Sequence, residues 1–285
     1  MMRIIVKITI GLVALVSSFF VNAQEFQGKA IYQTKIKMGD DFKKRMDGSK
    51  MPEDRKVFMM QMIKKRMEKV YELDFAKTNS TYKEQKSLVA PSANERFNRS
   101  ANDLLFKDIK NQTFVNKKET FGKVFLIIDS IAKLNWKLEK ETKMIGNYLC
   151  LKATTQAVVN NSMNRFRRFS SKEKNKKTDS TKVKTPKKTK ITAWYAPEIP
   201  VANGPAAYGG LPGLILQLDV GNLQMLCTKI VINPKEKAVI IAPSKGKKIT
   251  QKDYDKVMEE KVKEMRARYQ NNRKKSGSQR HSKRR

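Results

Sequence analysis

The chain has 285 residues and carries 61 Lys and Arg against 27 Asp and Glu, a formal net charge of +34. This length supports one large domain with appendages and leaves ample chain for a hydrophobic core. Two separate cysteines exclude a zinc cluster of Cys and His. The single histidine, His281, lies in a basic tail, which excludes a structured Ser-His-Asp or Cys-His centre.

The N-terminus has the features of a secretory signal peptide. Arg3 and Lys7 precede a short apolar run over 8–21, and a small residue, Ala23, follows it. The run is shorter than a comfortable membrane span, and no later stretch is long and apolar enough to span a bilayer. We therefore expect 1–23 to be removed after Ala23 and the mature chain to be exported, to the periplasm or out of the cell.

Short apolar-polar alternations typical of β-strands fill the first half of the mature chain. One helix interrupts them, because proline and two acids at 52–54 suit a helix start and apolar residues recur every three or four positions to about Lys69. The predicted strands are 28–37, 71–75, 80–88, 104–109, 112–116, 123–129, 136–141 and 148–159.

A basic insertion follows these strands. Residues 161–190 hold twelve Lys and Arg against Glu173 and Asp179, with little apolar material. Like charges at that density repel one another, so we predict a disordered insertion. Attraction to polyanions is one interpretation, and a solvated extension without a partner is the other.

A loop rich in proline and glycine lies between strands predicted at 189–195 and 214–220. Proline restricts φ and glycine admits unusual backbone angles, so this loop is expected to hold one shape. It forms either a contact surface for a protein or an apolar ligand, or a structural cover for the end of the sheet. The candidate binding residues are Trp194, Tyr195, Pro197, Glu198, Pro200, Gly204, Pro205, Gly210, Leu211, Pro212 and Gly213.

The C-terminal part contains two more predicted strands, 223–232 and 238–242, and then a helix over 250–270 that Thr250 caps. Residues 271–285 carry seven Lys and Arg and no acid, which predicts a disordered basic tail.

The two cysteines, Cys150 and Cys227, lie in strands predicted on either side of the basic insertion. An oxidising compartment permits a disulfide between them. Two buried free thiols fit the same pattern, because free cysteine packs as a small hydrophobe. Both alternatives remain open, since the distance between the residues is not visible in the sequence.

Many short strands joined by short turns predict a mainly β fold of the α+β type. We expect a large curved antiparallel sheet, or half-barrel, with two flanking helices. A single β-rich domain over 24–249 would contain the insertion and precede the C-terminal helix.

Several segments carry a family resemblance. Residues 210–215 read GLPGLI and 193–200 read AWYAPEIP, and further matching segments are 71–75, 135–138, 146–153 and 204–205. On these motifs the chain resembles the GLPGLI family of exported bacterial proteins over about 24–235. The resemblance implies export and a β-rich fold, and it supplies no activity or catalytic residues. The long insertion departs from the short turn found in relatives.

The sequence offers little for catalysis. Asp108, Asp129, Glu198 and Asp219 are the carboxylates that could serve a hydrolase, but their spacing favours turn caps and lysine partners. Neither a Walker nor a dinucleotide glycine motif is present, and no cofactor or metal is expected.

We therefore predict an exported, non-enzymatic envelope protein that binds an unknown protein or apolar ligand, as an assembly or chaperone-like module would. One alternative is a polyanion-binding envelope protein that uses the Lys and Arg of 161–190 and 271–285. The other alternative is a carboxylate-dependent hydrolase.

Overall fold

The computed structural model describes residues 26–37, 47–49, 51–85, 102–158 and 188–282. The predicted signal peptide lies outside these residues, as does most of the basic insertion. Cleavage after Ala23 and disorder of the insertion up to residue 187 therefore stay predictions.

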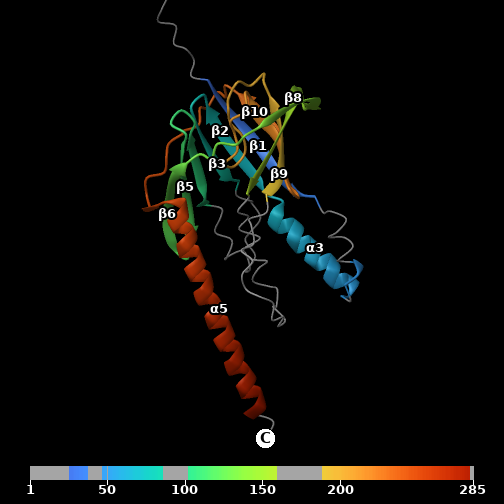
Figure 1. Cartoon of the computed structure of the whole chain (residues 1–285), viewed down its shortest axis with the longest axis vertical. Helices are drawn as coiled ribbons and strands as arrows, with labels where there is room; N and C mark the ends of the chain where they lie inside the picture. The colour runs from blue at the N-terminus through green and yellow to red at the C-terminus, as the bar shows by residue number, and fades with distance from the viewer. Residues whose placement is uncertain (1–25, 38–46, 50, 86–101, 159–187, 283–285) are drawn as a thin grey trace, which may run out of the picture.

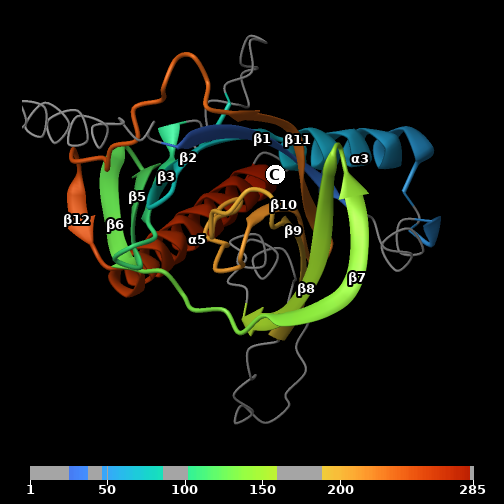
Figure 2. The same ribbon diagram turned by 90° about the horizontal axis from the view of Figure 1, so that it is seen from above.

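Within the described residues, twelve strands form one open sheet in the order β12-β6-β5-β4-β3-β2-β1-β11-β10-β9-β8-β7. Neighbours are antiparallel except β12 and β6, and the sheet bends into an arc (Figure 2). The predicted mainly β fold with two helices is confirmed. The strands are β1 (Gln27–Ile36), β2 (Val70–Ala76), β3 (Asn79–Glu84), β4 (Leu104–Asp108), β5 (Thr113–Thr120), β6 (Lys123–Ser130), β7 (Lys137–Ile145), β8 (Tyr148–Val158), β9 (Lys188–Ala196), β10 (Leu214–Val220), β11 (Leu223–Ile232) and β12 (Lys247–Ile249).

The first strand joins the two halves of the sheet. β1 pairs with β2 on one side and with β11 on the other, so residues from the two ends of the domain lie side by side. Most other neighbours are hairpins between consecutive strands, as in β7–β8, whose turn contains Gly146 at a φ of +58°. Glycine populates such left-handed angles readily, which explains the turn at this position.

The two faces of the sheet differ in chemistry because strand side chains alternate. On β1, alternate residues such as Ala30 and Tyr32 are buried. The other face of β1–β3 carries cross-strand ion pairs: the Nζ of Lys29 lies 3.0 Å from Glu72, and the Nζ of Lys83 also lies 3.0 Å from Glu72. The apolar face is therefore the one that packs.

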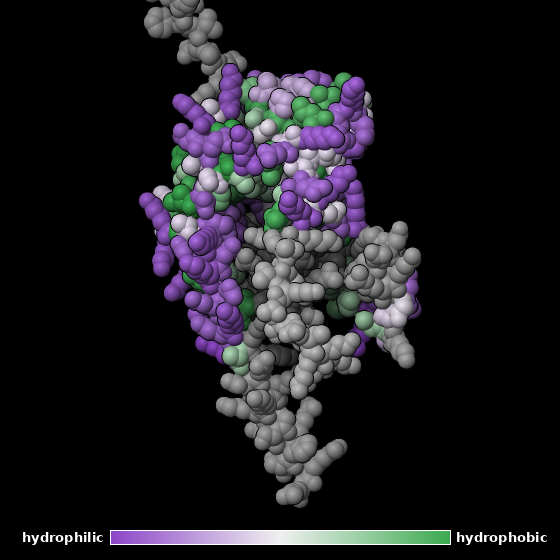
Figure 3. Space-filling view, in the orientation of Figure 1, coloured by the Kyte–Doolittle hydropathy of each residue, from purple (hydrophilic) through white to green (hydrophobic). Residues whose placement is uncertain are grey.

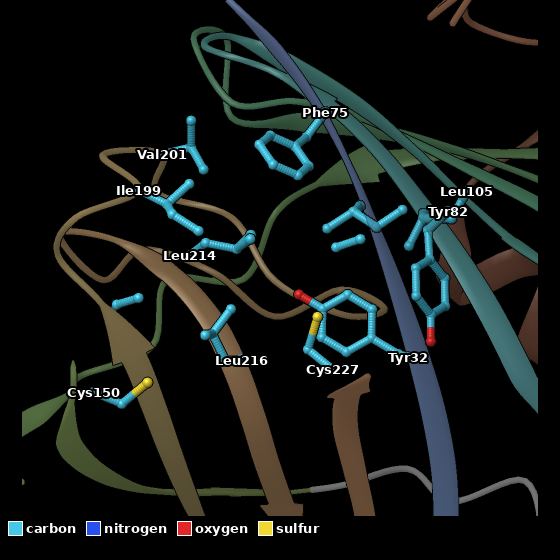
Figure 4. Close-up of a cluster of buried hydrophobic side chains, with 13 residues drawn as sticks. Tyr32, Phe75, Tyr82, Leu105, Cys150, Ile199, Val201, Leu214, Leu216 and Cys227 are labelled. Atoms are coloured by element: carbon cyan, nitrogen blue, oxygen red, sulfur yellow. The ribbon is translucent and has the colours of Figure 1, made fainter. Parts of the chain in front are cut away.

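The main hydrophobic cluster lies between the central strands and the segment of residues 197–213, which we call the proline–glycine loop (Figure 4). A second cluster joins β8–β11 to Leu211 of the same loop. The loop thus takes part in both clusters. The larger side chains of the main cluster are Tyr32, Leu73, Phe75, Tyr82, Leu105, Ile199, Val201, Leu214 and Leu216.

The two helices, α3 (Glu53–Met67) and α5 (Gln251–Ser282), match the two that were predicted. Tyr254 seats α5 on the sheet: its ring centroid lies 5.6 Å from that of Phe125, and its hydroxyl shares a 2.8 Å hydrogen bond with Thr120. Hydrophilic side chains gather at the surface near the start of α5 (Figure 3). Val57, Phe58 and Met62 of α3 are exposed, so this part of the apolar side predicted for the helix is not buried.

The helix α5 continues to Ser282 instead of giving way to a tail near residue 270 (Figure 1). Its later part holds Gln, Arg and Lys, which are good helix formers, and no proline. No helix in the described part of the chain has both the length and the apolar character needed to cross a bilayer.

Several predicted boundaries differ in the structure. The strand predicted at 80–88 ends at Glu84, and those predicted at 112–116 and 136–141 continue to Thr120 and Ile145. Residues 238–242 do not form a strand, and Val239 and Ile241 are 78% and 67% exposed, because the edge of β6 pairs with β12 instead. The predicted insertion ends earlier than residue 190, because Lys188 and Thr189 already pair with the end of β8.

Candidate functional site

The proline–glycine loop connects β9 to β10 and lies inside the arc of the sheet (Figure 2). It reaches β4, although β11, β1, β2 and β3 separate β10 from β4 in the sheet order. The loop therefore crosses the concave side from one arm of the sheet toward the other.

Backbone hydrogen bonds give the loop a defined conformation. The amide of Gly210 donates to the carbonyl of Ala202 at 3.1 Å. At the start of β10, the amide of Leu214 donates to Ile199 at 3.0 Å and that of Ile215 donates to Asn203 at 3.0 Å. The loop folds back on itself and is joined to the strand that follows it.

Three side chains from other parts of the sheet hold the loop and its exit. The Nζ of Lys107 on β4 donates to the carbonyl of Gly204 at 2.8 Å and to that of Tyr208 at 3.2 Å. The Nε1 of Trp136, just before β7, donates to the carbonyl of Gly209 at 3.0 Å. The hydroxyl of Tyr32 on β1 donates to Ile215 at 2.7 Å. Both arms and the centre of the sheet thus contribute.

Lys107 is the most unusual of these anchors. It is 2% exposed, and both of its hydrogen-bond partners are backbone carbonyl oxygens. Burial disfavours the charged form and lowers the pKa of Lys107 to about 7. Sequence analysis did not single out this residue, because a lysine within an alternating strand reads as a solvent-facing position.

The aromatic pair predicted for ligand contact is divided between surface and core. Tyr195 is 3% exposed and packs with Ile215 and Leu218. Trp194 is half-buried, and the Nζ of Lys143 lies 5.4 Å from its ring centroid. Only Trp194 of the two presents part of its ring to solvent.

The other predicted site residues are divided in the same way. The exposed group consists of Pro197, Glu198, Pro200, Gly210 and Pro212. The buried group consists of Gly204, Pro205, Leu211 and Gly213. The eleven residues therefore do not form one continuous surface. A binding role for the exposed group stays a prediction.

A cavity of about 180 Å³ lies where the loop meets β2–β5. We call it the tyrosine pocket. Its lining residues are Tyr71, Tyr82, Lys83, Glu84, Asp103, Leu105, Asn116, Lys118 and Ala206. Sequence reasoning missed this site. Tyr71 alone falls in a segment that the family resemblance marked, and strand pairing brings in the rest.

The two tyrosines stack on each other at the pocket, with ring centroids 5.0 Å apart and ring planes inclined by 8°. Burial raises the pKa of Tyr71 to about 12, and the charges of Glu84 and Asp103 add to the rise. Burial also raises the pKa of Asp103 to about 6, against the lowering effect of Lys118. The Nζ of Lys69 lies 2.6 Å from the carboxylate of Glu84.

Several polar groups of the pocket form no hydrogen bond with the described part of the chain. Among the described residues, neither the phenol oxygens of Tyr71 and Tyr82 nor the side-chain amide of Asn116 forms a hydrogen bond. Asp103 accepts a single long bond, 3.4 Å, from the amide of Glu119. These polar atoms reach solvent at the cavity, where they are available to bond a ligand, so the cavity is a candidate binding site.

The two cysteines are free thiols, and the disulfide that the sequence left open is not formed. Cys150 lies on β8 and Cys227 on β11, and both are buried in the main cluster (Figure 4). Burial raises the pKa of Cys150 to about 11 and that of Cys227 to about 12. Both thiols stay protonated at neutral pH and are poor nucleophiles.

The four carboxylates considered for a hydrolase have local partners. Asp108 accepts from the amide of Asn111 at 2.9 Å, and Asp129 accepts from the amide of Ser130 at 2.8 Å. In addition, Asp219 pairs with Lys37 at 2.8 Å and Glu198 accepts from Leu149 at 3.4 Å. Asp108 thus caps a turn and Asp219 pairs with a lysine, as predicted, whereas Glu198 contacts the backbone of β8. Among the described residues, no three His, Cys, Asp or Glu side chains group as a metal site would need.

The site is thus a curved, open β-sheet with a loop clamped across its concave side. Residues 136–217, which include the whole loop, match the model of a family described as a protein of unknown function, Porph_ging. This is the GLPGLI family of Bacteroidetes proteins, so the resemblance seen in the sequence is confirmed.

Two solved structures of PNGF-II, in the C2 and P21 space groups, are similar to the chain at 14% identity, with TM-scores of 0.47 and 0.46. Each match covers 81% of this chain and 32% of the other, so this chain spans about a third of the PNGF-II chain. No curated protein matches the chain.

Gly213 is predicted to be essential for seating the loop. A Cβ at this position would lie 2.3 Å from the carbonyl oxygen of Ala196, so Gly213→Ala should reduce the free energy of unfolding by about 2–4 kcal/mol. Gly210→Ala is the matched control. Its φ is +82°, but no atom lies within 4 Å, so about 1 kcal/mol is expected. Urea unfolding measures both, and equal losses would contradict the close packing of Gly213.

The burial of Lys107 predicts that the free energy of unfolding changes with pH. Its pKa falls from 10.5 to about 7 on folding, so between these values the unfolded chain binds more protons and stability rises with pH. The stability of the wild type relative to Lys107→Met should therefore increase between about pH 7 and 10.5, by at most about 1.4 kcal/mol per pH unit. The measurement is urea unfolding of both proteins across this range. A difference that does not change with pH would show that Lys107 is not buried as described.

Proposed function

We propose that the protein is an exported, non-enzymatic binding module of the cell envelope. It holds its partner on the concave side of the sheet, beside the proline–glycine loop. The observation that carries this proposal is the tyrosine pocket, a cavity of about 180 Å³ with unpaired polar groups at the junction of loop and sheet. The signal-peptide pattern supports export, to the periplasm or beyond.

The packing of the concave side favours a small inserted group over an acyl chain. Leu211 and Tyr195 are buried against the sheet, and the loop occupies the space that a long apolar ligand would need. Pockets for drug-sized ligands measure about 300–1,000 Å³. A cavity of about 180 Å³ suits a single ring or side chain of a larger partner.

The chemistry of the site favours binding over turnover. The two thiols have raised pKa values, and the four carboxylates that the sequence offered have local partners. The hydrolase alternative would instead use Asp103 and Glu84, which both line the tyrosine pocket. Turnover of a substrate that is lost in Asp103→Asn would establish that alternative.

A second candidate function is attraction to polyanions through α5. Residues 265–282 hold six Lys and Arg and no acid, and this part of the helix projects away from the sheet (Figure 1). A helix segment with this excess of positive charge attracts polyanions such as nucleic acid or lipopolysaccharide.

Filling the tyrosine pocket should abolish partner binding. Asn116→Tyr places a ring in the cavity and removes no protein hydrogen bond, so the fold should be kept. Lys117→Tyr is the matched control, because the neighbouring residue of β5 faces the other side of the sheet. The mature chain should retain a partner from envelope extract, Lys117→Tyr should retain it as well, and Asn116→Tyr should lose it. Retention by Asn116→Tyr would contradict a site in the pocket.

The polyanion proposal predicts salt-sensitive binding that depends on α5. Changing the six Lys and Arg of 265–282 to Gln preserves helix propensity and removes the charge. Binding to a short DNA duplex or to lipopolysaccharide should weaken, and the dependence of log K on log salt should become shallower. Titrations at several salt concentrations measure this. Unchanged affinity and slope would reject a role for the helix.

A further inference from the structure

The hydrogen-bonding groups of the tyrosine pocket include both donors and acceptors. A phenol and a carboxamide each donate and accept, whereas an ionised carboxylate accepts only. Tyr71, Tyr82 and Asn116 offer these groups with no partner among the described residues, and Asp103 adds a carboxyl. Such a set is complementary to hydroxyl groups, each of which also donates and accepts.

The charges at the pocket are balanced. Glu84 and Asp103 line it, and the ammonium groups of Lys118 and Lys69 act on Asp103. The ammonium of Lys83 instead pairs with Glu72 on the other face of the sheet. The opposite charges at the pocket offset one another, so neither a cationic nor an anionic ligand gains a large net attraction. A neutral ligand needs no such attraction. Lys69 also holds the carboxylate of Glu84 at 2.6 Å, which reduces its attraction for an outside cation.

The apolar part of the lining consists of the two tyrosine rings, Leu105 and Ala206. The rings stack at 5.0 Å, and Tyr82 is 7% exposed, so each ring restricts the orientation of the other. The hydroxyl groups are therefore held in position before a ligand arrives, which lowers the entropy cost of binding. The pocket combines a fixed apolar wall with fixed polar groups, in a volume that admits one ring.

From this combination we infer that the tyrosine pocket binds a neutral polyhydroxylated group, a single sugar residue of an envelope glycan. This inference rests on the proposed binding function and names the chemistry of its ligand. The ring hydroxyls exchange hydrogen bonds with Tyr71, Tyr82 and Asn116, and the C–H face of the sugar packs on the apolar wall.

The test uses the mature chain with methyl glycosides of glucose, mannose and N-acetylglucosamine as probes, in saturation-transfer NMR and calorimetry. At least one glycoside should bind. Tyr82→Phe should weaken it about 3- to 10-fold, the effect of one lost hydrogen bond. Tyr148→Phe is the matched control, because Tyr148 lies on β8 outside the pocket lining, and it should leave the affinity unchanged. Tyr82→Phe removes no hydrogen bond within the described residues and should fold normally.

Other outcomes would overturn the sugar inference and separate it from the proposed function. If arginine amide or phosphate binds and no glycoside does, or if Tyr82→Phe and Tyr148→Phe behave alike, the sugar inference is wrong. If no glycoside binds but a partner from envelope extract is lost only in Asn116→Tyr, the inference fails and the binding function stands. If extract yields no partner either, both fail. Release of nitrophenol from a nitrophenyl glycoside would also reject both.

Discussion

The concave side of this protein depends on one buried lysine side chain. Lys107 reaches from β4 to the carbonyls of Gly204 and Tyr208, and it thereby holds a loop whose ends belong to β9 and β10. The sheet is open, with β7 and β12 at its two edges, so contacts across the arc restrain its curvature. Lys107 has no acidic partner among the described residues, so its burial is costly, and its bonds to two carbonyl oxygens offset part of that cost.

The clamped loop also decides what the concave side can accommodate. Leu211 and Tyr195 are used for packing, and the space left beside Ala206 is a small pocket with polar and aromatic walls. A half-barrel with an empty interior would suit a long apolar ligand. Here the loop fills that space, so the geometry favours a ligand that is short, rigid and able to form hydrogen bonds.

The two proposed binding activities use separate parts of the molecule and respond to different conditions. The tyrosine pocket has balanced charges, whereas the later part of α5 carries basic residues without acids. Binding in the pocket should be nearly independent of salt, and binding through the helix should weaken steeply with it. The strong positive charge of the chain is therefore no guide to what the pocket recognises.

Local patterns in the sequence predict the existence of strands β1 to β11, most of their turns, the first helix and the proline–glycine loop, because alternation, helix starts and turn chemistry are local properties. The ends of β3, β5 and β7 differ from the predicted ones. The motifs also carry the family resemblance, but the sequence leaves the Cys150–Cys227 pairing open and gives Lys107 no special role. Tertiary structure alone decided those points and built the tyrosine pocket, because strand register and a contact between residues 97 positions apart bring the groups together. Sequence periodicity reports contacts between residues a few positions apart, so it cannot predict a contact over that separation.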